Sequence, residues 1–203
     1  MPQSIAVHGI DNSPRGRLLS AAARLFRDKG YERTTVRDIA AVVGIQSGSI
    51  FYHFKTKEDI LFAVMEEVIH FNTERLRAAI AAEERPVERL RALVRAELTA
   101  IVGDTSEAMT VMVTEWRCLN TDKQREALAL RDIYEQLWLD VLTDLHQEGR
   151  FRADPFIMRR LITGMTGWTH NWFDQSRSLS VEGLADLIVD RVVGEDDGEE
   201  GAA

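Results

Sequence analysis

Apolar side chains recur every three or four residues along most of this chain, and this helical spacing constrains the fold more than any other feature. No segment alternates apolar and polar residues for long enough to predict a β-strand. The spacing predicts nine helices, over residues 13–29, 34–43, 46–52, 56–82, 86–102, 106–116, 120–149, 154–173 and from 180 onward. We therefore expect an all-α fold.

Start and stop signals agree with these helices. Ser13 followed by Pro14 is typical of a helix start, because a serine caps the free amides and proline needs no N–H at the first helical position. Gly30 and Gly44 are placed to end the first two helices in a left-handed turn. Asp154 before a proline marks another start.

Charge divides the chain unequally. Residues 14–60 carry nine basic and five acidic side chains, a net charge of +4, whereas residues 61–203 carry 16 basic and 27 acidic ones, a net charge of −11. A basic N-terminal quarter on an acidic remainder is typical of a nucleic-acid-binding head on a different body. Solvation of helix faces by these charges is the alternative interpretation. We expect a flexible arm at residues 1–12, a first part at 13–60, a second at 61–194 and a disordered acidic tail at 195–203.

Other features limit where the protein works and what it contains. The chain has no run near the ~18 apolar residues that cross a bilayer and no secretory signal at its start, so we expect a cytoplasmic protein without a membrane partner. The single cysteine, Cys118, excludes an internal disulfide. The five histidines never pair at metal-ligand spacing on one helix, and nucleotide-loop and hydrolase motifs are missing. We predict no metal, no cofactor and no enzyme activity.

Residues 34–57 carry the clearest motif, with a helix-turn-helix expected over about residues 35–54. Gly44 allows the tight turn between two helices, and Ala40 lets them approach closely. Ile39, Ile45, Ile50 and Phe54 are expected to form a small core, and Phe51 is also assigned to it. The opposite face then presents Gln46, Ser47, Gly48, Ser49, Tyr52 and His53, which suits reading of base edges in a major groove.

This segment resembles the DNA-binding domain of the TetR/AcrR family of transcriptional regulators. The resemblance is carried by Phe26, Gly30, Thr34-Thr35, Ile39-Ala40, Gly44, Ser47, Gly48, Phe51-Tyr52, Phe54, Lys57 and Leu61. It implies an N-terminal three-helix DNA-binding domain and a C-terminal helical bundle for ligand binding and dimerisation. It also implies DNA contacts from Thr34, Thr35, Arg37, Gln46, Ser47, Gly48, Ser49, Tyr52, His53 and Lys57. Packing or plain surface roles are the alternatives for Arg37, Tyr52 and His53.

The resemblance further implies a homodimer that binds palindromic double-stranded DNA. The 154–173 helix is apolar on more than one side, which favours a partner beyond its own subunit. We expect Ile157, Leu161, Trp172, Leu184 and Ile188 in that dimer interface. Complete burial inside one subunit is the alternative.

A ligand pocket is predicted from methionines and aromatics at helical spacing. The candidates are Met109, Met112, Val113, Trp116, Trp138, Met165 and Trp168, with ordinary core packing as the alternative. The C-terminal part is similar to a subgroup that acyl-CoA thioesters release from DNA. We therefore expect a repressor with a small lipophilic effector, with acyl-CoA as one class. A regulator of efflux genes that senses a drug-like or aromatic compound remains open, as does a DNA binder without a small ligand.

Overall fold

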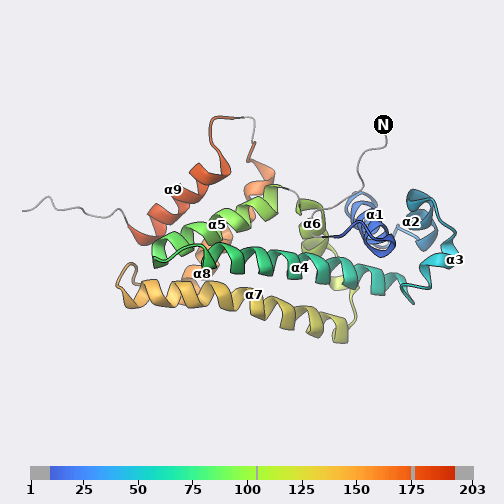
Figure 1. Ribbon diagram of the computed structural model, residues 1–203, viewed down its shortest axis with the longest axis horizontal. Helices are drawn as coiled ribbons and strands as arrows, with labels where there is room; N and C mark the ends of the chain where they lie inside the picture. Colours follow the sequence, from blue (N-terminus) through green and yellow to red (C-terminus); the bar gives the residue numbers. More distant parts are fainter. Residues whose placement is uncertain (1–9, 104, 175–176, 195–203) are drawn as a thin grey trace, which may run out of the picture. The chain divides into compact units, whose positions relative to one another are not determined.

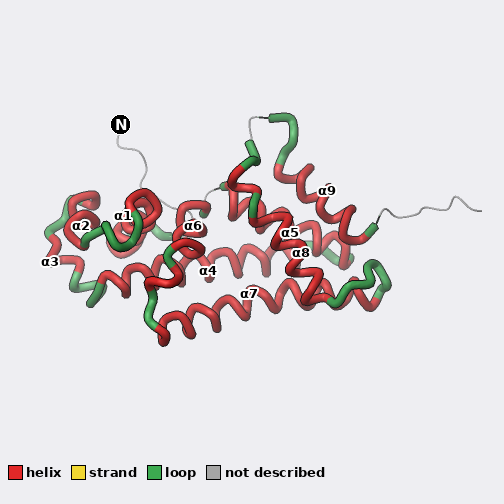
Figure 2. The backbone as a smooth tube through the Cα atoms, turned by 180° about the vertical axis from the view of Figure 1, so that it is seen from behind, coloured by secondary structure: helices red, strands yellow, loops and turns green. Residues whose placement is uncertain are grey.

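The computed structural model describes residues 10–103, 105–174 and 177–194, and within these ranges the protein contains nine α-helices, two short 3-10 helices and no strand (Figures 1 and 2). The expected all-α fold is confirmed. The α-helices are α1 (Pro14–Lys29), α2 (Val36–Val43), α3 (Ser47–Ile50), α4 (Lys57–Ala81), α5 (Pro86–Val102), α6 (Ser106–Thr114), α7 (Thr121–Gln147), α8 (Pro155–Gly167) and α9 (Val181–Val193). The expected acidic tail, and the arm up to residue 9, lie outside the described residues.

These helices form two compact units that interleave along the sequence. The first unit comprises residues 1–72 and 103–132, and the second comprises residues 73–102 and 133–203. Two long helices, α4 and α7, therefore contribute residues to both units. The division at residue 60 expected from the sequence is a functional one and stays a prediction, because α6 and the start of α7 belong to the same compact unit as α1–α3.

Local signals build the first unit as expected. The Ser13 side chain accepts a hydrogen bond from the Gly16 amide at the start of α1. Thr35 and Asp38 form a capping box at the start of α2, which satisfies two amides at once. Gly44 ends that helix with φ 77°, a left-handed conformation that favours glycine. Helix α1 packs against α2 and α6, and α2 packs against α3.

The core of this unit differs from the expected one at three residues. Ile39 and Ile50 are fully buried and Phe54 is 7% exposed, as the motif predicts. Ile45 is 38% exposed and Phe51 is 56% exposed, so placing them in the core was wrong. Conversely, Ile10 is 6% exposed and joins the core, although it falls in the expected flexible arm. Helix α3 is only four residues long, and the isoleucine and phenylalanine four positions apart hold it to the core.

The second unit is built around α5, which packs against α8 and α9. Asp154 caps α8 and Pro155 opens it, as predicted, and Ser180 caps α9. Helix α8 ends at Gly167 and a 3-10 turn follows at Thr169–Asn171, so the 154–173 segment is not one continuous helix. Trp138 is the largest fully buried side chain of this core.

Candidate nucleic-acid interface

Helix α3 turns a polar surface outward. Ile50 holds the helix to the core, while Gln46, Gly48 and Ser49 are exposed and Ser47 is half-buried. A Cβ built on Gly48 meets no atom of the chain within 4 Å. The fold itself therefore leaves room for a side chain at this position, and the bare backbone on an exposed face allows close approach by a partner.

Aromatic rings lie open just beyond this helix. Tyr52 is 89% exposed and stands edge-on to the His53 ring, at 5.3 Å between ring centroids. Phe51 next to them is more than half exposed. Solvated aromatic side chains of this size are costly to leave open, and they are suited to contacts with sugar, phosphate or a thymine methyl group.

The two threonines before α2 have other tasks than the one expected. The Thr34 side chain is buried, and its hydroxyl donates to the Gly30 carbonyl at 2.9 Å and to the Leu25 carbonyl at 3.2 Å. The Thr35 hydroxyl is bound to the Asp38 carboxylate at 2.8 Å. Hydrogen bonds from the Thr35 amide and hydroxyl lower the pKa of Asp38, whose charge occupies the α2 N-terminus. The expectation that the Thr34 hydroxyl holds a phosphate is corrected, because that side chain is buried, while a DNA contact from the exposed Thr35 stays a prediction.

Eight of the nine basic residues between 14 and 60 fall into two groups, and the ninth, Arg24, is a half-buried residue of α1. Five of the nine basic residues between 14 and 60 contact other parts of the chain, namely Arg15, Arg17, Arg27, Lys29 and Lys57. Arg33, Arg37 and Lys55 are exposed and have neither a hydrogen bond nor an ion pair to any described residue. Arg33 precedes α2, Arg37 lies in its first turn and Lys55 follows α3, and free cations at these places favour an anionic partner. Reasoning from the sequence had singled out only Arg37 of these three, although all three were counted in the basic excess.

Lys57 does not extend into solvent. Its amine donates to the Tyr31 carbonyl at 2.7 Å and to the Thr34 carbonyl at 3.0 Å. The same amine lies 4.0 Å from the centre of the Tyr31 ring. These contacts bind the start of α4 to the corner between α1 and α2.

The residues expected to line one ligand pocket belong to different units. Met109, Met112 and Trp116 pack against the core of the first unit, while Val113 is 74% exposed. Trp138 is fully buried in the core of the second unit. In that second unit Met165 is 38% exposed and Trp168 is 66% exposed.

Sequence reasoning missed Asn72, a buried polar side chain of α4. It is 4% exposed, its amide nitrogen contacts the Met109 sulfur at 3.5 Å, and its amide oxygen has no partner among the described residues. An unpaired buried oxygen of this kind is costly, so a bound water molecule or a ligand donor is the partner that such a position accepts. No sequence pattern distinguishes Asn72 from a surface asparagine.

A buried ionic network spans α5, α7 and α8 in the second unit. Arg159 is 2% exposed and pairs with Glu97 at 2.7 Å and with Glu135 at 3.2 Å. Burial disfavours its charge, but the attraction and hydrogen bonds of Glu97 outweigh burial and raise the pKa of Arg159. Tyr134 donates to Glu97 at 3.0 Å, and burial followed by the Glu97 charge raises the pKa of Tyr134 well above its usual value. Arg159 is thus fully engaged by the chain itself.

The expected dimer residues separate into two groups. Ile157, Leu161 and Trp172 are each about half exposed, at 50%, 54% and 51%. Leu184 and Ile188 of α9 are 9% and 6% exposed and belong to the core of their own unit, so assigning them to an interface between subunits is corrected. Phe156 and Leu187, also more than half exposed, were not predicted. The open face is therefore mainly that of α8 and the turn after it.

Comparison with known proteins decides the family. A family model described as bacterial regulatory proteins, tetR family, matches residues 18–64, and the model of a tetracyclin repressor-like C-terminal domain matches residues 83–194. The second match alone covers more than half of the chain. The chain belongs to the TetR family. Residues 18–64 contain the helix-turn-helix, so the surface of α3 described above lies in the N-terminal domain that this family model describes.

Relatives from several sources share the whole length. The transcriptional repressor KstR2 of Mycobacterium tuberculosis (strain ATCC 25618 / H37Rv) is 29% identical over 190 residues, which cover 93% of this chain and 95% of the relative. The crystal structure of the superantigen PfiT is 52% identical, covers 91% of this chain and 98% of its own, and has a TM-score of 0.82. AibR, solved with isovaleryl coenzyme A and operator DNA, is 27% identical over 88% of this chain and 97% of its own, with a TM-score of 0.78.

No group of three or more histidine, cysteine or acidic side chains is placed to hold a metal ion within the described ranges. None of the helices described in the structure is both long and apolar enough to cross a bilayer.

Proposed function

We propose that this chain is a homodimeric transcriptional repressor that binds a two-fold-symmetric DNA operator through α3 and is released by a small lipophilic effector. The observation that carries the proposal is the exposed face of α3, with its bare Gly48 and the free cations Arg37 and Lys55 near it. Polar side chains on an exposed helix can form hydrogen bonds with base edges in the major groove, while unpaired cations beside them can contact the phosphates on either side of the groove. The role is regulatory, without a reaction catalysed by the chain.

A homodimer is supported by the open apolar face of α8. Ile157 and Leu161 lie one helical turn apart on that face, and Trp172 follows beyond its end. Exposed apolar side chains in such a group favour a contact with a second copy of the chain. One head contacts too few base pairs for useful selectivity, whereas two heads about one DNA turn apart (~34 Å) read a palindrome.

For the effector we propose an acyl-CoA thioester. AibR supports this class, because it was solved with isovaleryl coenzyme A, while the name of KstR2 as a ketosteroid regulator supports only a lipophilic effector in general. The unpaired oxygen of Asn72 suits an amide N–H or hydroxyl donor on such a molecule. Arg159 is not available to bind the phosphates of coenzyme A, because Glu97 and Glu135 neutralise it. The effector acts only if it binds the DNA-incompetent arrangement more tightly than the competent one.

The DNA-binding proposal is tested by selection from a pool of random duplexes at low ionic strength. The wild-type protein is expected to enrich a two-fold-symmetric site. Gly48→Ala is the matched variant: it should keep or slightly raise the melting temperature, because alanine stabilises a helix by up to about 1 kcal/mol relative to glycine and meets no atom there. The added methyl group should nevertheless abolish enrichment. Enrichment of no symmetric site by the wild-type protein would contradict the proposal.

The effector is tested by titrating the selected complex with acyl-CoAs of increasing chain length, with free fatty acids and with cationic dyes. Release by acyl-CoAs alone is the expected result. Asn72→Leu, which removes the unpaired oxygen at similar volume, should weaken that release while operator affinity without effector stays unchanged. Release by the dyes alone would favour a regulator that senses drug-like compounds, and release by none of them would contradict a lipophilic effector.

A further inference from the structure

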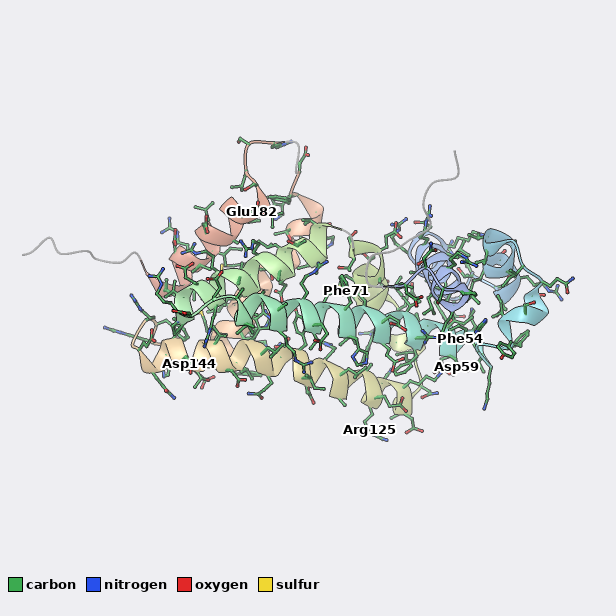
Figure 3. All side chains as sticks on the ribbon, viewed as in Figure 1. Phe54, Asp59, Phe71, Arg125, Asp144 and Glu182 are labelled. Atoms are coloured by element: carbon green, nitrogen blue, oxygen red, sulfur yellow. The ribbon has the colours of Figure 1, made fainter. Side chains whose placement is uncertain are left out.

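The first turn of α4 binds two other segments of its unit, the corner between α1 and α2 and the start of α7. Lys57, Glu58 and Asp59 are consecutive, and each makes a different long-range contact (Figure 3 labels Asp59). Lys57 donates to the carbonyls of Tyr31 and Thr34 at the corner between α1 and α2. Glu58 accepts a hydrogen bond from the Asn120 amide at 2.6 Å, just before α7 begins. Three charged side chains at a helix start usually face water, so three separate anchors here are informative.

We propose that Lys57 is a positioning residue that sets the pose of α2 and α3, and that it does not contact a DNA phosphate; this rests on the DNA-binding function proposed above. Two of the three donors of its amine are used by carbonyls at 2.7 and 3.0 Å. The Tyr31 ring lies 4.0 Å from the same amine and packs against Phe26 of α1, at 5.4 Å between centroids. The amine is therefore held from several sides.

The carbonyls that Lys57 binds lie just before α2 in the sequence. Thr34 immediately precedes the capping residue of α2, and α2 leads through Gly44 into α3. The Thr34 hydroxyl in turn donates to Gly30 at the end of α1. A cation that neutralises carbonyl dipoles at this corner fixes the orientation of α2, because hydrogen bonds to charged groups are stronger than neutral ones.

Asp59 and Glu58 connect the same turn to α7. Asp59 caps its own helix by accepting a hydrogen bond from the Thr56 amide at 2.8 Å, and it also pairs with Lys123 of α7. Burial opposes its charge, but the hydrogen bonds from Lys123 and Thr56 outweigh burial and lower the pKa of Asp59. The corner that carries α2 and the start of α7 are thus held by adjacent residues of one helical turn.

Lys55 provides the matched control. It lies two residues before Lys57, is exposed, and has no hydrogen bond or ion pair among the described residues. A phosphate contact releases condensed counterions, so its loss reduces the slope of log affinity against log salt by about one unit. A positioning residue acts through other contacts, so its loss lowers affinity and leaves that slope unchanged.

The experiment measures operator affinity of the full-length protein over a range of salt concentrations, on the duplex that the wild-type protein selects. Lys57→Met is expected to weaken binding by about tenfold, on the scale of one lost base contact, at unchanged slope. Lys55→Met is expected to reduce the slope by about one unit. Lys57→Arg is the second variant if Lys57→Met fails to fold. The larger planar guanidinium does not fit between the two carbonyls and the Tyr31 ring, so operator affinity should still fall while the salt slope stays constant.

A reduced slope for Lys57→Met, or full affinity for either Lys57 variant, would overturn the positioning role. Hydrogen exchange without DNA separates this inference from the DNA-binding proposal. Lys57→Met or Lys57→Arg should speed exchange of the α2 and α3 amides, and Lys55→Met should not. If the wild-type protein selects no duplex, the DNA-binding proposal fails, while faster exchange in the Lys57 variants still supports the role of Lys57 in holding α2. Unchanged exchange in those variants would refute that role.

Discussion

Replacement of Arg159 by methionine should destabilise the protein far more than any surface charge change. Arg159 is 2% exposed and makes two hydrogen bonds with Glu97, itself 5% exposed, at 2.7 and 3.2 Å. Removing one partner of a buried pair leaves the other charge without compensation and costs about 3–5 kcal/mol. Tyr134 and Thr166 still donate to Glu97, at 3.0 and 2.6 Å, so we expect the lower half of that range.

The second acid does not change this expectation. Glu135 also pairs with Arg159, but its side chain is 19% exposed and Arg160 lies 3.5 Å away. Water and Arg160 therefore compensate Glu135 when Arg159 is removed. The contact of the Arg159 guanidinium with the Trp138 ring, at 4.0 Å to the centroid, adds about 1 kcal/mol to the loss.

The assay is urea unfolding followed by circular dichroism at one fixed protein concentration, because association stabilises a dimer by mass action. The double variant Glu97→Gln with Arg159→Met should be at least about 1 kcal/mol more stable than Arg159→Met alone, since no buried charge is left unpaired. Arg125→Met, whose pair with Asp122 is exposed on both sides, is the control and should change stability by less than about 1 kcal/mol. A loss below about 1 kcal/mol for Arg159→Met, or additive losses in the double variant, would refute this reasoning.

Three further predictions concern the interface and the titrating groups. Leu161→Glu places a charge on the open face of α8, so sedimentation should show monomers and operator affinity should be lost. The far-ultraviolet circular dichroism spectrum should stay unchanged. A variant that remains a dimer would contradict the assignment of this face to the dimer interface. Asp59→Asn should lower the free energy of unfolding by about 1 kcal/mol near neutral pH. Because folding lowers the pKa of Asp59, its contribution to stability is present above the unfolded pKa of about 3.9 and fades at lower pH. The unfolding free energies of the wild-type protein and the variant should therefore converge in acid. Burial, then the charge of Glu58, raises the pKa of Tyr31 to about 12, so its contribution is complete below about pH 10 and is lost as pH rises through 12. Tyr31→Phe should therefore unfold less steeply in alkali, and an identical alkaline profile would contradict the assignment.

The sequence predicts the helices well because their signals are local. Ser13, Thr35, Gly44 and Asp154 each act within four residues of their own position, and the structure places a cap or a turn at each one. Apolar spacing identifies Ile39 and Ile50 as core residues for the same reason. Where the spacing is short, as in the four-residue α3, it loses resolution, and Ile45 and Phe51 were placed on the wrong side.

The candidate site was predictable only in part, because the roles of its polar residues depend on distant partners. Lys57 binds carbonyls 23 and 26 residues away, and Arg159 binds a carboxylate 62 residues away. From sequence alone, a lysine at a helix start and an arginine in an apolar helix both suggest contacts with an external anion. In the structure the Lys57 amine is bound by two carbonyls, and the Arg159 charge is neutralised by carboxylates, in both cases inside the chain. The exposed cations Arg33 and Lys55 had no distinguishing pattern beyond the local charge excess.

Coupling between effector and DNA has a short physical route in this chain. Helices α4 and α7 each contribute residues to both compact units, and both start in the unit that carries α3. Within that unit, Glu58 and Asp59 hold the start of α7 to the same turn whose Lys57 binds the corner before α2. For the proposed effector, we expect a change in the position of either long helix to reach α2 and α3 through this turn. To shift the equilibrium between the DNA-competent and released arrangements from 99:1 to 1:99, such an effector must favour the released arrangement by about 5.5 kcal/mol.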